Sequence, residues 1–193
     1  MTPVKTRIDG FVSLRSTRLP DARGSLTRLF DSNLASTLGI GATWKQILQS
    51  HTAHKNTLRG LHVQLPPQPE AKLVTCQQGH MFWAVADVRA GSPTFGKWDA
   101  LTLSGEAGDG FYAEPGLAHG CLSLSDDVIL TIASSEDFRP EFGAGIHWQD
   151  PEIGIAWPLD GRPMLSDAHA AYPSFAEFRR TQSSPEVREA AHA

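Results

Sequence analysis

The stretch His80-Met81-Phe82-Trp83-Ala84-Val85-Ala86-Asp87-Val88 decides the fold class of this 193-residue chain. Successive side chains of an extended strand point to opposite faces of its sheet. One face of this stretch carries Met81, Trp83, Val85 and Asp87, and the other carries Phe82, Ala84, Ala86 and Val88. Both faces are mostly apolar, so the stretch is predicted to be a central strand that is covered on both sides.

Further short runs of β-forming residues lie on either side of this stretch. They are Thr43–Leu48, Lys72–Cys76, Asp99–Leu103, Gly110–Ala113 and Val128–Ala133. Turn residues separate them, including Pro66-Pro67, Gly91-Ser92-Pro93 and Pro115-Gly116. Many short strands with closely spaced Gly and Pro turns are typical of an all-β sandwich, barrel or jelly roll.

Helical patterns are few. Asp31-Ser32-Asn33 before Leu34–Leu38 predicts a short capped helix, and Tyr172–Arg180 predicts a second one. The polar segment from 181 to 193 has no burial pattern and is expected to be a frayed or disordered tail. No repeat or linker divides the rest, so residues 1–180 are predicted to form one domain.

The composition excludes several classes of protein. With 17 Lys and Arg against 21 Asp and Glu, the net charge of −4 gives no general attraction to nucleic acid or to an anionic membrane. Cys76 and Cys121 are the only cysteines, too few for a disulfide scaffold. The first ten residues are polar and charged, and runs such as Phe82–Val85 are too short to cross a bilayer. We therefore expect a soluble cytoplasmic protein.

Two blocks of sequence carry residues suited to acid–base chemistry. The first is Leu58-Arg59-Gly60-Leu61-His62, followed ten residues after His62 by Lys72. If inward positions of neighbouring strands converge, a base and two cations face one anionic ligand, as proton abstraction beside a carbonyl requires. The second block, Pro115–Gly120, adds His119 beside a turn.

The histidine spacing does not predict a metal centre. Metal sites in small β barrels usually pair histidines two residues apart and add a carboxylate. Here Gln64 stands two residues after His62, and His119 stands alone. We therefore predict no metal ion.

Several blocks, taken in order, resemble one family. They are Asp21–Gly24, Leu58–Gln64, Ala71–Val74, Asp87–Trp98, Pro115–Gly120, Leu124–Asp126 and Trp148–Pro158. Together they resemble the dTDP-4-dehydrorhamnose 3,5-epimerase family over roughly residues 5 to 175. The resemblance implies a cupin-type double-stranded β-helix (jelly roll) with a few short helices. It also implies a homodimer with an exchanged N-terminal strand, and neither a metal nor an organic cofactor.

The resemblance also implies a ligand and roles for named residues. The family acts on nucleotide-linked 4-keto-6-deoxy sugars in deoxysugar biosynthesis, where the C4 ketone makes the C3 and C5 protons acidic. His62 would be the base and Lys72 would stabilise the enolate oxygen. The substrate-binding residues would be Arg23 and Arg59 at the diphosphate, His119 at the sugar, and Gln49 and Gln64.

The chain departs from the family pattern at two catalytic positions. Ile132 stands at the position of the family's proton-donating tyrosine. His169 stands at the position of the aspartate that orients the base, and Asp167 is the nearest carboxylate that could replace it. An imidazole partner does not raise the basicity of His62 as a carboxylate does. Tyr112, Cys121 or water are the candidates for the missing acid.

Three functions remain open from the sequence. The first is epimerisation of the 4-keto sugar through an enolate, at C3 and without a requirement for C5. The second uses the same ligand but ends in isomerisation or dehydration of the enolate. The third is binding of a sugar nucleotide without catalysis. A metal-dependent cupin oxygenase is a more distant alternative.

Overall fold

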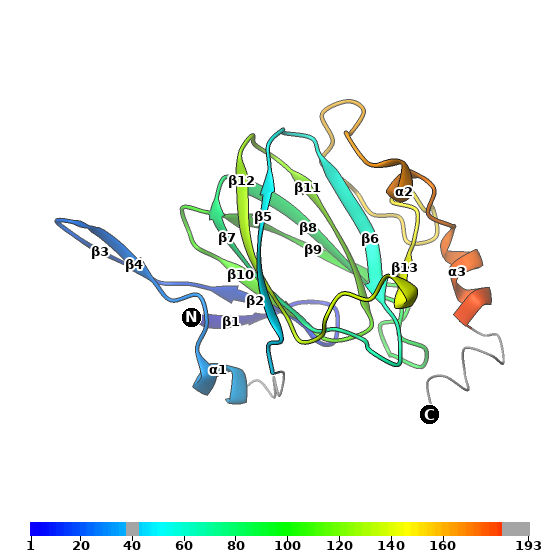
Figure 1. Ribbon diagram of the computed structural model, residues 1–193, viewed down its shortest axis with the longest axis horizontal. Helices are drawn as coiled ribbons and strands as arrows, with labels where there is room; N and C mark the ends of the chain where they lie inside the picture. Colours follow the sequence, from blue (N-terminus) through cyan, green and yellow to red (C-terminus); the bar gives the residue numbers. More distant parts are fainter. Residues whose placement is uncertain (38–42, 183–193) are drawn as a thin grey trace.

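Two antiparallel sheets face each other in the computed structural model, which describes residues 1–37 and 43–182 (Figure 1). The first sheet has the order β1 (Thr2–Lys5), β2 (Phe11–Arg15), β10 (Gly110–Ala113), β7 (Lys72–Gln78), β12 (Val128–Ser134), β5 (Gln46–Thr52). The second has the order β13 (Gly143–Gly145), β6 (Leu58–Gln64), β11 (Leu117–Ser123), β8 (His80–Asp87), β9 (Trp98–Ser104). The predicted all-β jelly roll is confirmed.

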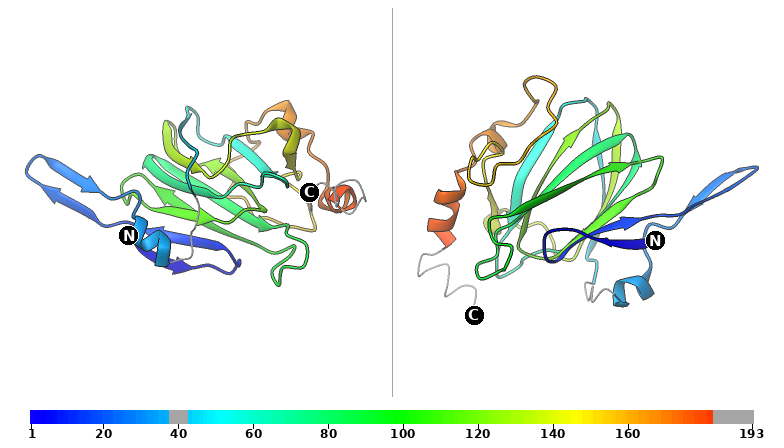
Figure 2. Two further views of the ribbon diagram at one scale, coloured as in Figure 1. Left: turned by 60° about the horizontal axis from the view of Figure 1, so that its bottom comes forward. Right: turned by 180° about the vertical axis from the view of Figure 1, so that it is seen from behind.

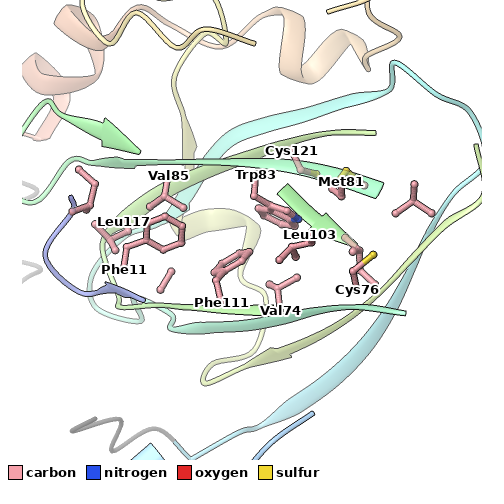
Figure 3. Close-up of a cluster of buried hydrophobic side chains, with 14 residues drawn as sticks. Phe11, Val74, Cys76, Met81, Trp83, Val85, Leu103, Phe111, Leu117 and Cys121 are labelled. Carbon is pink, nitrogen blue, oxygen red and sulfur yellow. The ribbon is translucent and has the colours of Figure 1, made fainter. Parts of the chain in front are cut away.

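The space between the sheets holds the main hydrophobic core (Figure 3). Strand β8 pairs with β11 on one side and β9 on the other, which confirms the prediction of a central strand. Its inward residues Met81, Trp83 and Val85 are at most 4% exposed, and so are Ala84 and Ala86 on the other face. Burial on both faces explains why this strand alternates between two kinds of apolar residue rather than between apolar and polar ones.

A hairpin of β3 (Arg18–Asp21) and β4 (Gly24–Thr27) projects from the two sheets (Figures 1 and 2). It was not predicted from the sequence, because its strands are short and mostly polar. Leu19 and Leu26 lie opposite each other on it and are 61% and 71% exposed. Large apolar side chains with this exposure favour contact with another surface.

The helices are short, as predicted. They are α1 (Ser32–Thr37), α2 (Asp167–Ala170), α3 (Phe175–Gln182) and the 3-10 turn η1 (Pro140–Phe142). Helix α3 begins later than the predicted Tyr172, because Ser174 and Glu177 form a capping box. The Ser174 backbone N–H donates to the Glu177 carboxylate at 2.9 Å, and the Glu177 N–H donates to Ser174 Oγ at 3.3 Å.

Parts of two predictions fall outside the described residues. They are the end of the first predicted helix, at Leu38, and most of the predicted tail, from 183 to 193. Within the described part of the chain, no helix is long and apolar enough to cross a membrane.

Candidate active site

A cavity of about 80 Å³ lies between the two sheets and is reached by side chains from β5, β6, β7, β8, β11 and β12. Its lining consists of Ser50, Thr52, Arg59, His62, Lys72, Met81, Trp83, His119, Cys121, Leu130 and Ile132. The predicted base, the predicted lysine, Arg59 and His119 are therefore brought together. Because β6 and β7 belong to different sheets, His62 and Lys72 approach the cavity from different sheets.

Two glycines let β6 and β11 approach closely enough to place His62 beside His119. A Cβ atom on Gly60 would lie 2.5 Å from the His119 carbonyl oxygen, and one on Gly120 would lie 2.8 Å from the Arg59 carbonyl oxygen. Gly60 also has a φ of +97°, which side-chain-bearing residues rarely adopt. The imidazole rings of His62 and His119 then lie 4.4 Å apart between centroids and are nearly perpendicular.

Both histidines are held in the neutral form. Burial, followed by the neighbouring His119 and Lys72, holds the pKa of His62 well below its ordinary value. Burial and Lys72 lower the pKa of His119 to about 3. The Nδ1 atom of His119 contacts the Leu117 carbonyl oxygen at 3.2 Å, which favours the tautomer that donates from Nδ1. A neutral His62 is able to accept a proton at neutral pH, although burial makes it a weak base.

Lys72 is held by a network that the sequence did not reveal. Its Nζ lies 2.7 Å from Glu70 Oε1 and donates to Ser134 Oγ at 2.8 Å. Ser134 Oγ in turn donates to Glu70 Oε2 at 3.0 Å. The Glu70 side chain is only 5% exposed, so a buried carboxylate compensates the ammonium charge and fixes its position. Adjacency of Glu70 to the Ala71-Lys72 block was the only signal in the sequence.

His169 lies near His62 but does not orient it. The two rings are 6.1 Å apart between centroids, with an interplanar angle of 11°. His169 Nδ1 instead accepts from the backbone N–H of Gly60 at 3.4 Å, and its ring lies 5.3 Å from that of Tyr172. Burial lowers the pKa of His169, so it too favours the neutral form.

The Nδ1 atom of His62 is therefore left without a partner. It is buried and has no hydrogen bond to any described residue. Asp167 does not supply the missing carboxylate, since it is the exposed first residue of α2. A carboxylate partner would fix the proton on Nδ1 and leave Nε2 free as a base. Here no such partner selects the tautomer.

Ile132 brings no proton donor to the cavity. It lines the cavity, so the residue predicted to stand in place of the family's tyrosine does face the ligand space. Cys121 also lines it, but burial raises the pKa of its thiol to about 12. Tyr112 does not reach the cavity, because it packs in a separate cluster with Leu14 and Leu73. Of the three candidates for the acid, Tyr112 is therefore not placed to act in this cavity.

The other predicted binding residues are spread over the molecule. Arg59 lines the cavity and remains exposed, as contact with a diphosphate requires. Arg23 lies in the turn of the β3–β4 hairpin and pairs with Asp21 at 2.7 Å. Gln49 is exposed on β5, where strand alternation directs it away from its cavity-lining neighbour Ser50.

Gln64 is occupied by structural hydrogen bonds. It is buried, and its Nε2 donates to the Gln68 and Asp137 carbonyl oxygens at 2.7 and 3.0 Å. Its Oε1 accepts from the Arg139 backbone N–H at 2.9 Å. The side chain ties two loops to β6, and it is not among the residues that line the cavity.

Metal-binding groups are not gathered in this cavity. Among residues 1–37 and 43–182, no group of three or more His, Cys, Asp or Glu side chains is arranged to hold a metal ion. The imidazoles of His62 and His119 share the cavity with the cations Lys72 and Arg59, which oppose binding of a further positive charge.

Comparison with known proteins is consistent with this geometry. The profile of the family described as dTDP-4-dehydrorhamnose 3,5-epimerase matches residues 5–177. A protein of that description from Sinorhizobium fredii is 35% identical over 165 residues, covering 86% of this chain and 85% of its own length. The structure of an epimerase from Mycobacterium tuberculosis has a TM-score of 0.89 and 34% identity, covering 100% of this chain and 98% of that one. A 3'-monoepimerase from Streptomyces bikiniensis in complex with dTDP-quinovose has a TM-score of 0.86 and 30% identity, with full coverage of both chains.

Proposed function

The chain belongs to the dTDP-4-dehydrorhamnose 3,5-epimerase family of enzymes, and we propose that it acts on a nucleotide-linked 4-keto-6-deoxy sugar through an enolate at C3. The observation that carries the proposal is the shared cavity of His62 and Lys72, which come from different sheets. The S. bikiniensis relative, a 3'-monoepimerase, supports a reaction at C3 alone. C5 is not required to react.

Removal of the proton uses His62 as the base and Lys72 as the electrostatic partner. Neutral His62 takes the C3 proton with Nε2, which requires the tautomer that carries hydrogen on Nδ1. The electron pair moves toward the C4 oxygen, and the ammonium of Lys72 stabilises the negative charge that develops there. Arg59 and His119 bind the diphosphate and the sugar.

Return of a proton to the opposite face is expected to be slower than removal of the C3 proton. Inversion at C3 requires a donor on the face opposite His62, and we infer that Ile132, which lines the same cavity, occupies that side. The remaining sources are water and the thiol of Cys121, and a thiol with a pKa of about 12 is a weak acid. His62 itself returns a proton to the original face, which regenerates the substrate; when the proton on Nε2 has first exchanged with solvent, the substrate regains a solvent hydrogen at C3. We therefore propose that exchange of the C3 hydrogen with solvent is faster than inversion.

The projecting hairpin supports a homodimer. The β3–β4 hairpin presents Leu19 and Leu26 to solvent and carries Arg23 in its turn, away from its own cavity. In a dimer the hairpin of one copy covers the other, and Arg23 contacts the diphosphate bound by that second copy. Replacement of both leucines by serine should shift the protein from dimer to monomer in analytical ultracentrifugation. A wild-type protein that sediments as a monomer contradicts this assembly.

The test of the proposed function is incorporation of solvent deuterium. The protein is incubated in D₂O with dTDP-4-keto-6-deoxyglucose, and the signals of C3–H and C5–H are followed by NMR. We expect loss of the C3–H signal in the wild type and a loss of rate of about 10²- to 10⁴-fold in His62→Ala. His147→Ala is the matched control, since His147 lies outside the cavity. Absence of exchange at both carbons, or equal rates in His62→Ala, would overturn the proposal.

A second fate of the same enolate is favoured by Ile132. With no strong acid on the far face, the intermediate persists longer and is able to isomerise or to lose a β-hydroxyl group. The NMR spectra of the same reaction distinguish these fates, because an isomeric keto sugar or a dehydrated product has its own signals. Either product in place of the C3 epimer would assign the chain to that reaction.

A further inference from the structure

Unpaired polar atoms gather at the same cavity. Among the described residues, four buried side-chain nitrogen or oxygen atoms have no hydrogen-bond partner: Trp44 Nε1, Thr52 Oγ1, His62 Nδ1 and Trp83 Nε1. All but Trp44 belong to residues that line the cavity. Trp83 is 4% exposed and Thr52 is 3% exposed, so bulk water does not satisfy them. Buried polar groups are nearly always paired, so these two atoms indicate a ligand contact.

Trp83 and Thr52 reach the cavity from different sheets. Trp83 is on β8, opposite Cys121 in the strand register, and Thr52 is on β5, opposite Val128. Figure 3 shows the indole of Trp83 pointing from its strand into the space between the sheets, with the nitrogen at the end nearer Met81. Met81 and Leu130 surround this part of the cavity with apolar surface. Apolar surroundings strengthen a hydrogen bond and raise the cost of leaving it unmade.

The chemistry of the two atoms defines what they bind. An indole N–H donates only, so its partner must be an oxygen that accepts. A threonine hydroxyl is able both to donate and to accept. A hydroxyl group of the ligand satisfies both at once, because it accepts from Trp83 and donates to Thr52. A keto oxygen only accepts and is already matched to Lys72 in the proposed reaction.

We propose that Trp83 Nε1 and Thr52 Oγ1 form a hydroxyl-binding subsite that recognises one hydroxyl group of the sugar in the bound sugar nucleotide. The inference rests on the proposed function, and it adds two residues to which the reaction itself gives no role. A sugar that lacks this hydroxyl leaves both buried groups unpaired, so the subsite selects between deoxysugars.

Binding of two probes to four proteins tests the subsite. The probes are dTDP-4-keto-6-deoxyglucose and dTDP, and the proteins are the wild type, Trp83→Phe, Thr52→Val and Trp44→Phe. We expect Trp83→Phe and Thr52→Val each to weaken binding of the sugar nucleotide by about 3- to 10-fold, with no change for dTDP. Trp44→Phe is the matched control, because among the described residues it removes the one unpaired indole N–H outside the cavity. It should leave both affinities unchanged.

A spectroscopic readout separates ligand contact from a structural role. The Nε1–H signal of Trp83, assigned by its loss in Trp83→Phe, should move downfield on addition of the sugar nucleotide and stay in place with dTDP. Unchanged affinity of both cavity variants, or equal weakening for the two probes, would overturn the subsite. If the wild type binds neither probe, the proposed function itself is wrong.

Discussion

Two groups of side chains around the cavity differ in their chemistry. The first group, which we call the first wall, consists of His62 and His119 from one sheet and Lys72 from the other, and the Glu70–Ser134 network supports its lysine. The second group, which we call the second wall, consists of Leu130 and Ile132 on β12. In the proposed reaction the first wall removes a proton and stabilises the resulting charge. The second wall carries no acid to return a proton, so the proposal makes the two halves of epimerisation separable.

The largest expected effect comes from restoring the acid on the second wall. Ile132→Tyr places a phenol at the position predicted for the family's tyrosine, and the rate of C3 inversion should rise by about 10²- to 10⁴-fold. The exchange of C3–H should change little, because proton removal does not use this wall. The inversion rate is the rate at which the signals of the C3 epimer appear in the NMR spectrum. Ile132→Phe is the control for ring size, and an equal rise in that variant would show that packing, not proton donation, is responsible.

Removing the carboxylate that pairs with Lys72 should destabilise the fold. Glu70→Gln leaves the Lys72 ammonium, whose side chain is 14% exposed, without its carboxylate and should lower the unfolding free energy by about 2–4 kcal/mol. Urea denaturation at pH 7 measures this. The double variant Glu70→Gln/Lys72→Met should recover part of the loss, since no unpaired charge remains. Additive effects of the two single substitutions would contradict the proposed ion pair.

The histidines of the first wall should make stability depend on pH. The pKa of His119 is about 3 in the folded protein and about 6.5 in the unfolded chain, so below pH 6.5 the unfolded state binds the proton first. Stability is therefore fully present above pH 6.5 and falls as the pH decreases toward 3, by about 2 kcal/mol at pH 5. His119→Asn should flatten this difference between pH 7 and pH 5 in urea titrations. An unchanged slope would show that His119 is not buried as a neutral group.

A smaller effect is expected from restoring the orienting carboxylate. His169→Asp should raise the pKa of His62 and fix the proton on Nδ1, increasing C3 exchange by roughly tenfold. The acid limb of the pH–rate profile should move to higher pH, because His62 then protonates more easily. His169→Asn, which has nearly the same shape without the charge, should leave that limb where it is in the wild type. Identical profiles for Asp and Asn would contradict an electrostatic role at this position.

Prediction of strands from the sequence succeeded in part: the edge strand β9 was predicted at Asp99–Leu103, whereas the central strand β11 was not predicted. Strand β8 was predicted at His80–Val88 and is observed at His80–Asp87, because burial of both faces leaves a strong apolar pattern. Strand β5 was predicted at Thr43–Leu48 and is observed at Gln46–Thr52. As an edge strand it is largely exposed, so it lacks an apolar pattern that would define where the strand ends. The predicted strand stopped at Leu48, and Ser50 and Thr52 were therefore not predicted to line the site.

The site was predictable at residues whose type is itself associated with acid–base chemistry. His62, Lys72 and His119 were predicted and do converge, while Trp83 looked like an ordinary core residue. Its unpaired Nε1 is visible only once the surrounding side chains are placed. Glu70 and Ser134 are 64 residues apart and meet only through the pairing of β7 with β12. Such contacts depend on register, which composition does not specify.

The ratio of C3 exchange to C3 inversion in the wild-type protein tests most directly whether proton removal and proton return are separable. With dTDP-4-keto-6-deoxyglucose in D₂O, deuterium entering the substrate at C3 and deuterium in the inverted product are measured in the same NMR time course. An intact first wall and a second wall without an acid predict that exchange exceeds inversion by at least tenfold. Inversion that keeps pace with exchange would contradict this, because it would require an efficient proton donor on the side of Ile132.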